Sequence, residues 1–247
     1  MNGYDREFLK ANWSKLEGFS SDQNLGEEIP PMQKSLPEGA QIIPLEEIRH
    51  ADFCVHSLDE MIAGRKSVRK FTESKLTVAE LTWLLWATQG VRGMFRDDTI
   101  SMRTVPSGGS RHPFETYLVV NRVEGLAKGL YRFLPIDNSL VLLPDCPDED
   151  MVSDACLGQE FCGNSAVCFI WTAIPYRTEW RYGPVSSKII ALDAGHLCQN
   201  LYLAVGEIGA GTCAIGAYDQ VKADQIVGVD GQDEFVVYIA PVGKVEG

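Results

Sequence analysis

The apolar stretch at residues 189–205 constrains the fold of this 247-residue chain more than any other feature. It is apolar at most positions, and the polar residues that interrupt it are Asp193, His196, Gln199 and Asn200. A membrane-spanning helix needs about 20 largely apolar residues, so these interruptions exclude one here. The pattern predicts a long buried helix from about Ser187 to Ile208, with His196 and Gln199 as hydrogen-bonded core residues. It predicts no membrane partner.

Two further helices are marked by capping boxes, at Ser57–Glu60 and at Thr77–Glu80. In such a box the hydroxyl of the first residue and the carboxylate of the fourth satisfy exposed amides of the first helical turn. The first helix is expected to end near Gly64. The second is expected to end at Gly90, because glycine commonly terminates helices.

Apolar runs between turn residues predict six strands, at residues 116–121, 129–134, 140–143, 167–174, 212–217 and 234–242. Asp219 is expected to cap a short helix that ends at Val227. The segment rich in Arg, Gly and Asp between Gly90 and Pro106 is predicted to be a loop. Interleaved helices and strands of this kind indicate an α+β or α/β layered domain.

The first 45 residues differ from the rest of the sequence, because a short amphipathic stretch leads into polar residues punctuated by Pro30, Pro31, Pro37 and Pro44. This composition predicts an arm at 1–45 that lies on a single domain at 46–247. The first residues carry charges where a signal peptide needs an apolar core, so the expected location is cytoplasmic.

Charge and cysteine content exclude several classes of protein. The chain has 22 Lys and Arg against 34 Asp and Glu, a net charge of −12, which disfavours a nucleic-acid partner. The seven cysteines include no CxxC pair, and a reducing compartment with free thiols is expected. The even spacing of Cys156, Cys162 and Cys168 suggests a metal site, but Cys168 lies in an apolar strand-like run. No metal site is therefore predicted.

The segment from Arg65 to Arg69 suits an anion such as a phosphate. It places Arg65, Lys66, Ser67 and Arg69 within five residues. Guanidinium groups bind phosphate oxygens in a fork, and the hydroxyl adds a donor. Taken alone, so short a cluster is more typical of a solvated charged turn.

Two glycine-rich segments permit a close approach of backbone to a ligand, at residues 106–111 and 209–217. The first is also typical of a flexible surface loop, and the second lacks the GxGxxG pattern of a dinucleotide site. Serine-nucleophile, zinc-protease and phosphate-loop motifs are absent from the sequence, and His112 has no obvious catalytic context. A chain with an anion site but few acid–base residues is typical of an enzyme whose cofactor carries the reaction.

Together these segments resemble the nitroreductase-like FMN flavoproteins, and more closely their azoline-oxidase-type dehydrogenase branch. The resemblance is carried by RKSVRKF (65–71), LTWLLWATQGV (81–91), PSGGSRHPFETYLVV (106–120), GLYRF (129–133), RTEWRYGP (177–184), LDAGHLCQNLYLA (192–204), GTCAIGAYD (211–219) and PVGK (241–244). It implies an α+β fold with a central, mostly antiparallel sheet flanked by helices. It also implies an intertwined homodimer, with residues 187–208 as a central helix buried on all sides.

The resemblance implies FMN bound at the dimer interface. The residues implied to hold its phosphate and ribityl end are Arg65, Lys66, Ser67 and Arg69, completed by Lys244. The residues implied to line the isoalloxazine, from the partner subunit, are Pro106, Ser107, Gly108, Gly109 and Ser110. Those implied to lie near the flavin N5 are Ile215 and Gly216.

One pair departs from the branch pattern. The resemblance implies a Lys-Tyr pair that assists deprotonation, whereas this chain has Arg181-Tyr182. Arginine stays protonated at physiological pH, so Arg181 is a poor base but a good holder of anions. Tyr182 is still expected to donate a hydrogen bond or transfer a proton.

The leading interpretation is an FMN-dependent oxidoreductase of nitroreductase or azoline-dehydrogenase type, linked to NAD(P)H and working by ping-pong chemistry. Its substrate would be a small molecule, such as a nitroaromatic or a quinone, or a peptide azoline. One alternative is a non-catalytic FMN-binding or partner-docking protein that uses the arm to dock. Another is a thiol or metal protein built on the three evenly spaced cysteines.

Overall fold

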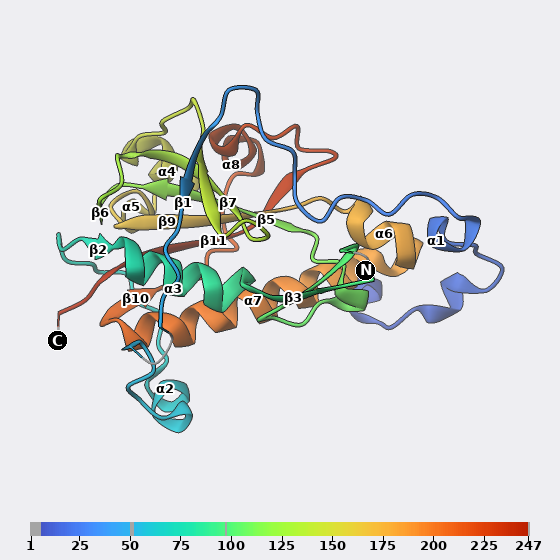
Figure 1. Ribbon diagram of the computed structural model, residues 1–247, viewed down its shortest axis with the longest axis horizontal. Helices are drawn as coiled ribbons and strands as arrows, with labels where there is room; N and C mark the ends of the chain where they lie inside the picture. The colour runs from blue at the N-terminus through green and yellow to red at the C-terminus, as the bar shows by residue number, and fades with distance from the viewer. Residues whose placement is uncertain (1–5, 50–51, 97, 247) are drawn as a thin grey trace, which may run out of the picture.

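The computed structural model describes residues 6–49, 52–96 and 98–246. Residues 1–5 of the expected arm and Gly247 of the expected domain lie outside the described residues. Seven strands form one sheet in the order β1-β8-β7-β5-β9-β11-β10, and every pair of neighbours in it is antiparallel (Figure 1). The predicted α+β fold with a mostly antiparallel sheet is therefore confirmed.

The strands of this sheet are β1 (Gln41–Pro44), β5 (Phe114–Val120), β7 (Gly129–Leu134), β8 (Ser139–Leu142), β9 (Val167–Ala173), β10 (Ala210–Thr212) and β11 (Phe235–Lys244). The central strands β5 and β9 are buried at every residue. Alternate residues of β5 enter two different cores: Leu118 packs into one and Val119 into the other. A sheet covered on both faces explains why most residues of these strands are apolar.

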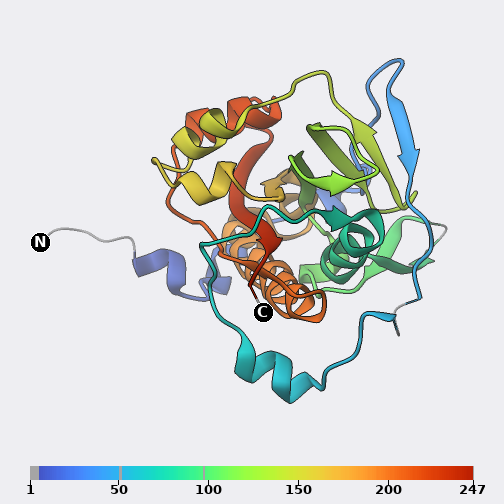
Figure 2. The same ribbon diagram turned by 90° about the vertical axis from the view of Figure 1, so that its left-hand side faces the viewer.

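Helices cover the two faces of the sheet separately. The helices of the first face are α3 (Val78–Gln89) and α7 (Ser186–Glu207); those of the second are α4 (Glu149–Ala155), α5 (Glu160–Gly163) and α8 (Gln220–Val227). Figure 2 shows the two groups on opposite sides of the strands. The helix α2 (Leu58–Gly64) projects from the body. Both predicted capping boxes are present, at Ser57 and Thr77, and Asp219 caps α8.

The helix α7 is confirmed, and in the single chain it is buried on one side only; its expected burial on all sides within a homodimer stays a prediction. One stripe is exposed, comprising Ala191, Leu192, Gly195, His196 and Gln199. Leu192 keeps 55% of its surface exposed, and His196 is not a core residue. The opposite side of α7 packs against α3 and the sheet, whereas no described residue covers this stripe.

Two other local predictions are wrong. The segment between Gly90 and Pro106 is not a loop but a hairpin of β3 (Val91–Phe95) and β4 (Ile100–Arg103). The strand predicted at 212–217 ends early, because β10 stops at Thr212 and beyond it only Ile215 bridges to the sheet. A short parallel pair joins β2 (Leu76–Thr77) to β6 (Val123–Glu124).

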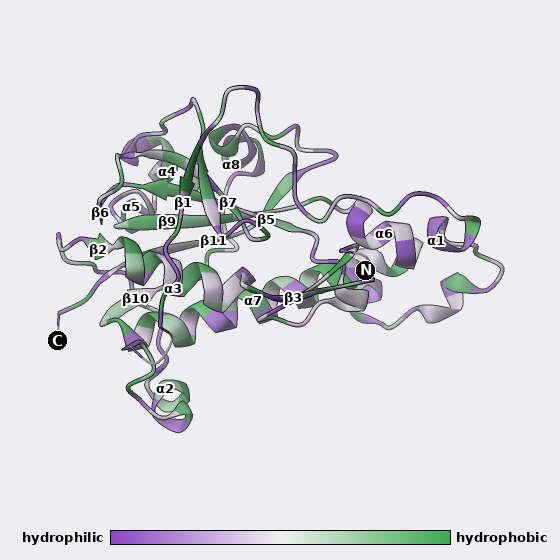
Figure 3. Ribbon diagram, in the orientation of Figure 1, coloured by the Kyte–Doolittle hydropathy of each residue, from purple (hydrophilic) through white to green (hydrophobic). Residues whose placement is uncertain are grey.

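The arm begins with two 3-10 turns, η1 (Arg6–Leu9) and η2 (Trp13–Leu16), followed by α1 (Asp22–Leu25). It then lies along α6 (Tyr176–Tyr182) and ends in β1, the edge strand beside β8 (Figure 1). Figure 3 shows the central strands largely in the hydrophobic colour and α6 largely in the hydrophilic one. No described helix is long and apolar enough to span a membrane.

Candidate functional site

Tyr202 of α7 joins two of the three segments singled out in the sequence. Its hydroxyl oxygen lies 2.9 Å from Ser67 Oγ and accepts a hydrogen bond from the Ala214 amide at 2.8 Å. The Arg65 guanidinium stacks over the Tyr202 ring, 5.3 Å from its centroid. Ser67 also forms a β-bridge to Thr212. We call Arg65, Ser67, Tyr202 and Ala214 the Tyr202 cluster; it unites the basic segment with the second glycine-rich segment.

The sequence did not identify Tyr202 as a site residue. Its signal is positional: Ala191, Gly195 and Tyr202 fall on one face of α7, because 3.6 residues make one helical turn. Tyr202 thus continues the stripe of small residues toward the basic segment.

The other two cations of the basic segment lie apart from this cluster. Lys66 and Arg69 line a separate open cavity of about 1110 Å³, together with residues of the α5 start and of the C-terminal segment. Their expected role toward the phosphate stays a prediction. Lys244 is already paired, since its Nζ donates to Glu80 Oε1 and to the Ile208 carbonyl oxygen. To complete the phosphate site as expected, Lys244 would have to exchange these partners for the phosphate.

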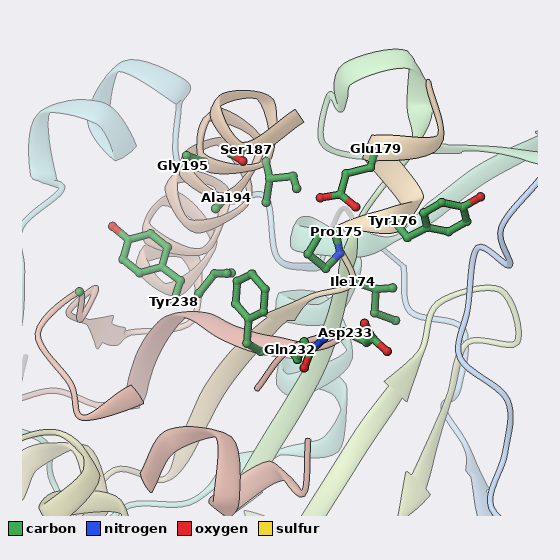
Figure 4. Close-up of a pocket in the computed structure, with 15 residues that line it drawn as sticks. Ile174, Pro175, Tyr176, Glu179, Ser187, Ala194, Gly195, Gln232, Asp233 and Tyr238 are labelled. Carbon is green, nitrogen blue, oxygen red and sulfur yellow. The ribbon is translucent and has the colours of Figure 1, made fainter. Parts of the chain in front are cut away.

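A cavity of about 930 Å³ lies next to the Tyr202 cluster, between α7 and the ends of β9 and β11 (Figure 4). Ala194 and Gly195 line it from α7, and Tyr238 lines it from β11. Gly216 also lines it, and a Cβ at that residue would meet no atom within 4 Å. The backbone of Gly216 is therefore open to a ligand, while its neighbour Ile215 is buried.

Acidic side chains lie at one end of this cavity. Glu179 of α6 directs its carboxylate into the space, and Asp233 approaches from the loop before β11 (Figure 4). Burial raises the pKa of Glu179. The remaining lining is mostly apolar, so the cavity suits a flat, largely apolar molecule.

The first glycine-rich segment, Pro106–Ser110, is held in place by Asp193 of α7. The Ser107 hydroxyl donates to Asp193 Oδ2 at 2.6 Å, and the Gly108 amide donates to the same oxygen at 3.1 Å. Gly109 has φ of +58°, a left-handed conformation that favours glycine. Burial raises the pKa of Asp193, which the Ser107 hydrogen bond partly offsets. The segment is a fixed loop.

Arg181 and Tyr182 pack directly on this loop. A Cβ at Gly109 would lie 2.8 Å from Tyr182 Oη and 2.9 Å from Arg181 Cδ. The Arg181 guanidinium lies over the Tyr182 ring, 5.5 Å from its centroid. The structure therefore brings the expected catalytic pair to the expected isoalloxazine loop. We call Pro106–Ser110, Arg181, Tyr182 and Asp193 the glycine-loop cluster.

The two clusters lie on opposite sides of α7. Asp193 and Ile189, which contact the glycine loop, are four residues apart and share one face. Ala191, Gly195 and Tyr202 share the other, since neighbours two positions apart are rotated by about 200°. The helix body therefore separates the clusters, and one chain does not present both to one small ligand.

The remaining candidate chemistry is buried. Cys156, Cys162 and Cys168 are buried free thiols, and no three His, Cys, Asp or Glu side chains in the described part of the chain could hold a metal ion. His112 is also buried, and its pKa is lowered to about 3, first by burial and then by the nearby Arg103 charge.

Comparison with known proteins agrees with this architecture. The family model described as "Nitroreductase family" matches residues 62–244. The protein named "Putative nitroreductase MJ1384" from Methanocaldococcus jannaschii is 31% identical over 198 residues, which cover 80% of this chain and 96% of that protein.

Two solved structures share the fold. A crystal structure named as a putative nitroreductase from Anabaena variabilis has a TM-score of 0.69 at 24% identity, and covers 85% of this chain but only 42% of its own. The E. coli microcin synthetase McbBCD complex with truncated pro-MccB17 bound contains a chain with a TM-score of 0.61 at 17% identity, which covers 99% of this chain and 95% of its own. At such identities these likenesses show the fold alone.

Proposed function

The chain belongs to the nitroreductase family, and from this premise we propose that it is an FMN-dependent oxidoreductase. The family supports an oxidoreductase role; FMN, the NAD(P)H co-substrate and the two-step reaction are our proposal. When bound, FMN supplies hydride transfer through N5, first from one substrate and then to a second. The chain's own residues would bind the FMN, orient the substrate and donate a proton to it.

The Tyr202 cluster carries the proposal. Arg65 has no carboxylate partner among the described residues, so its charge is available to a phosphate, and Ser67 adds a hydroxyl beside it. The cluster continues through Ala214 to the open backbone of Gly216 and the adjoining 930 Å³ cavity. A charged anchor next to a mostly apolar space fits a molecule with a phosphate tail and a flat ring.

The separation of the two clusters by α7 supports a homodimer. If the glycine loop lines the flavin, a second copy must supply it, because the loop of the same chain lies on the far side of the helix. The exposed stripe of α7, with Leu192 and Gly195, offers the surface on which that copy would pack. Each flavin would then contact the Tyr202 cluster of one chain and the glycine-loop cluster of the other.

Within the glycine-loop cluster we propose that Tyr182 donates a hydrogen bond or a proton to the substrate. Arg181 remains charged and would hold an anionic group rather than act as a base. The substrate class is a nitroaromatic, a quinone or a peptide azoline. An azoline is supported by the sequence resemblance, and the Arg181-Tyr182 pair is the point at which this chain departs from it.

We further propose the division into an extension at 1–45 and an FMN-binding domain at 46–247. The family match begins at residue 62, which supports a separate extension. The structural likeness to the microcin synthetase chain extends over nearly the whole chain, extension included.

The absorption spectrum of the purified protein, followed by anaerobic titration with NADH and NADPH, tests the proposal. We expect a flavin spectrum that bleaches on reduction and recovers when a nitroaromatic or quinone is added. Protein purified without flavin that also fails to bind added FMN would contradict the proposal. Flavin that binds but is not reduced would favour the non-catalytic FMN-binding protein instead.

A further inference from the structure

Described residues of the arm contact the segment 176–188, which carries the expected catalytic pair, at several points along its length. These contacts join Trp13 to Tyr182, Leu9 to Lys188, Asp22 to Tyr176, Glu27 to Trp180, and Phe19 to Gly183. Three are hydrogen bonds: Lys188 Nζ donates to the Leu9 carbonyl, Tyr176 Oη to Asp22 at 2.9 Å, and Trp180 Nε1 to the Glu27 carbonyl at 3.1 Å. The contacts span both ends of α6, beside which the arm lies in Figure 1.

Phe19 packs where only a glycine leaves room. A Cβ at Gly183 would lie 2.3 Å from Phe19 Cζ, and Gly183 has φ of +46°. Both the conformation and the contact therefore require glycine directly after Tyr182. The backbone that follows the catalytic candidate is shaped to receive an arm side chain.

The orientation of Tyr182 is set by contacts to its ring. Its hydroxyl has no hydrogen-bond partner among the described residues, so no hydrogen bond at that end fixes the ring. Within the glycine-loop cluster, the Tyr182 side chain contacts the Pro106–Ser110 loop and the Arg181 side chain. The arm adds the Trp13 ring, edge-on at 6.1 Å between centroids with an interplanar angle of 85°. Edge-to-face pairs of this geometry hold rings in a defined relative orientation.

We infer that Trp13 and Phe19 are positioning residues, through which the arm holds Tyr182 in its working orientation against the glycine loop. This inference rests on the proposed function, because it assigns the arm a part in turnover. It predicts a loss of turnover that leaves the phosphate anchor intact, since Trp13 contacts Tyr182 of the glycine-loop cluster and none of these arm contacts reaches the Tyr202 cluster. In the proposed dimer the arm of one chain would position Tyr182 beside the flavin whose phosphate is bound by the other chain.

The test compares Trp13→Ala with Trp13→Phe and with Leu9→Ala, each made in the whole 247-residue chain. Leu9→Ala is the matched control, because it also removes a large arm side chain, 71% exposed, and keeps the carbonyl that binds Lys188. With NADH and a nitroaromatic as probes, Trp13→Ala should lower kcat about 10-fold at unchanged FMN occupancy, since a misplaced group costs rate. Trp13→Phe and Leu9→Ala should keep kcat near that of the unmodified protein.

A double-mutant cycle distinguishes positioning from a general structural role. If Trp13 acts through Tyr182, Trp13→Ala should lower kcat no further in a Tyr182→Phe background. Equal losses in both backgrounds, or loss of FMN together with kcat, would overturn the inference.

Hydrogen exchange gives a readout that does not need activity. Trp13→Ala should speed the exchange of amides at 176–188 and leave those at 194–205 unchanged. Unchanged exchange at 176–188 would overturn the inference. A protein that shows the expected exchange but neither binds FMN nor oxidises NADH would instead contradict the proposed function.

Discussion

The Ser107 hydroxyl lies 2.6 Å from Oδ2 of Asp193, and this contact ties the glycine loop to the middle of α7. Asp193→Ala would leave the Ser107 hydroxyl and the Gly108 amide without their acceptor. An unpaired buried donor costs about 1–3 kcal/mol, and these two donors are partly buried, so the free energy of unfolding in urea should fall by about 1 kcal/mol. Asp193→Asn keeps an acceptor oxygen and should lose less. Equal stability of Asp193→Ala and the unmodified protein would show that the contact does not hold the loop.

Arg65→Ala should weaken FMN binding by about 1.5–3 kcal/mol, the contribution of a hydrogen bond to a charged group. Arg65→Ala combined with Ser67→Ala should yield mostly colourless protein. Flavin absorbance after purification and a fluorescence titration with FMN measure both effects. Lys70→Ala is the control, because Lys70 belongs to the same basic run but lines the separate 1110 Å³ cavity. Full flavin occupancy in the double variant would refute the phosphate assignment.

Gly195→Glu should abolish the dimer and flavin binding together. In the single chain this substitution meets open space, since a Cβ at Gly195 has no neighbour within 4 Å, so the chain itself should still fold. In the proposed dimer it would bury an unpaired carboxylate, which is costly. Light scattering and circular dichroism measure size and folding, with Gly195→Ala as the control. A yellow, folded Gly195→Glu monomer would contradict the shared site.

Tyr182→Phe should keep the FMN spectrum, because the ring still packs on the glycine loop. If the hydroxyl acts as a general acid or base, kcat should fall by roughly 10²–10⁴-fold. If it only binds the substrate, KM should rise while kcat holds. Arg181→Lys restores the Lys-Tyr pair of the azoline oxidases, and gained activity on a thiazoline peptide would identify Arg181 as the residue that sets substrate class. Unchanged kinetics in both variants would place the pair outside the active site.

His112 should make the protein sensitive to acid. Its pKa in the folded state is lowered from 6.5 to about 3, so folding disfavours its protonation. The stability it contributes is complete above pH 6.5 and is lost as the pH falls toward 3, by up to about 1.4 kcal/mol per pH unit. His112→Asn should flatten this slope in urea unfolding measured from pH 7 to 4, and asparagine tolerates the positive φ at this position. The same slope in both proteins would assign acid sensitivity to other groups.

The sequence predicted correctly those helices and strands that are determined by residues close to one another in the chain. The capping boxes at Ser57 and Thr77 place the first turns of α2 and α3 without reference to the rest of the chain. The central strands were equally readable, because burial on both faces leaves a mostly apolar run: β7 matches the predicted 129–134, and β9 differs from the predicted 167–174 by one residue.

Elements that depend on distant partners were missed. The strand β1 has only four residues, Gln41–Pro44, and they form a strand by pairing with β8, nearly a hundred residues away. The strand predicted at 212–217 stops early because the Ala214 amide is taken by the Tyr202 hydroxyl and not by a neighbouring strand. Neither partner is visible from local sequence.

The candidate site shows the same division. The glycine-rich and basic segments were found from composition, but Tyr202 and Asp193, which hold them, were not. Both lie in α7, where apolar and polar residues occur on every face. The segment that each face contacts is decided by how the whole chain packs. The exposed residues at 191–199 were predicted to be buried for the same reason. Their sequence does not show that no other element of the same chain packs on them.

The separation of the two clusters by α7 has a genetic consequence. When both chains of the proposed dimer carry a defect in the same cluster, both flavin sites are disabled. A mixed dimer of one chain defective at Arg65 and Ser67 and another defective at Tyr182 would hold one doubly damaged site and one intact site. In a random equal mixture about a quarter of all sites would be complete. Two inactive alleles of this one protein would therefore complement each other in the same cell.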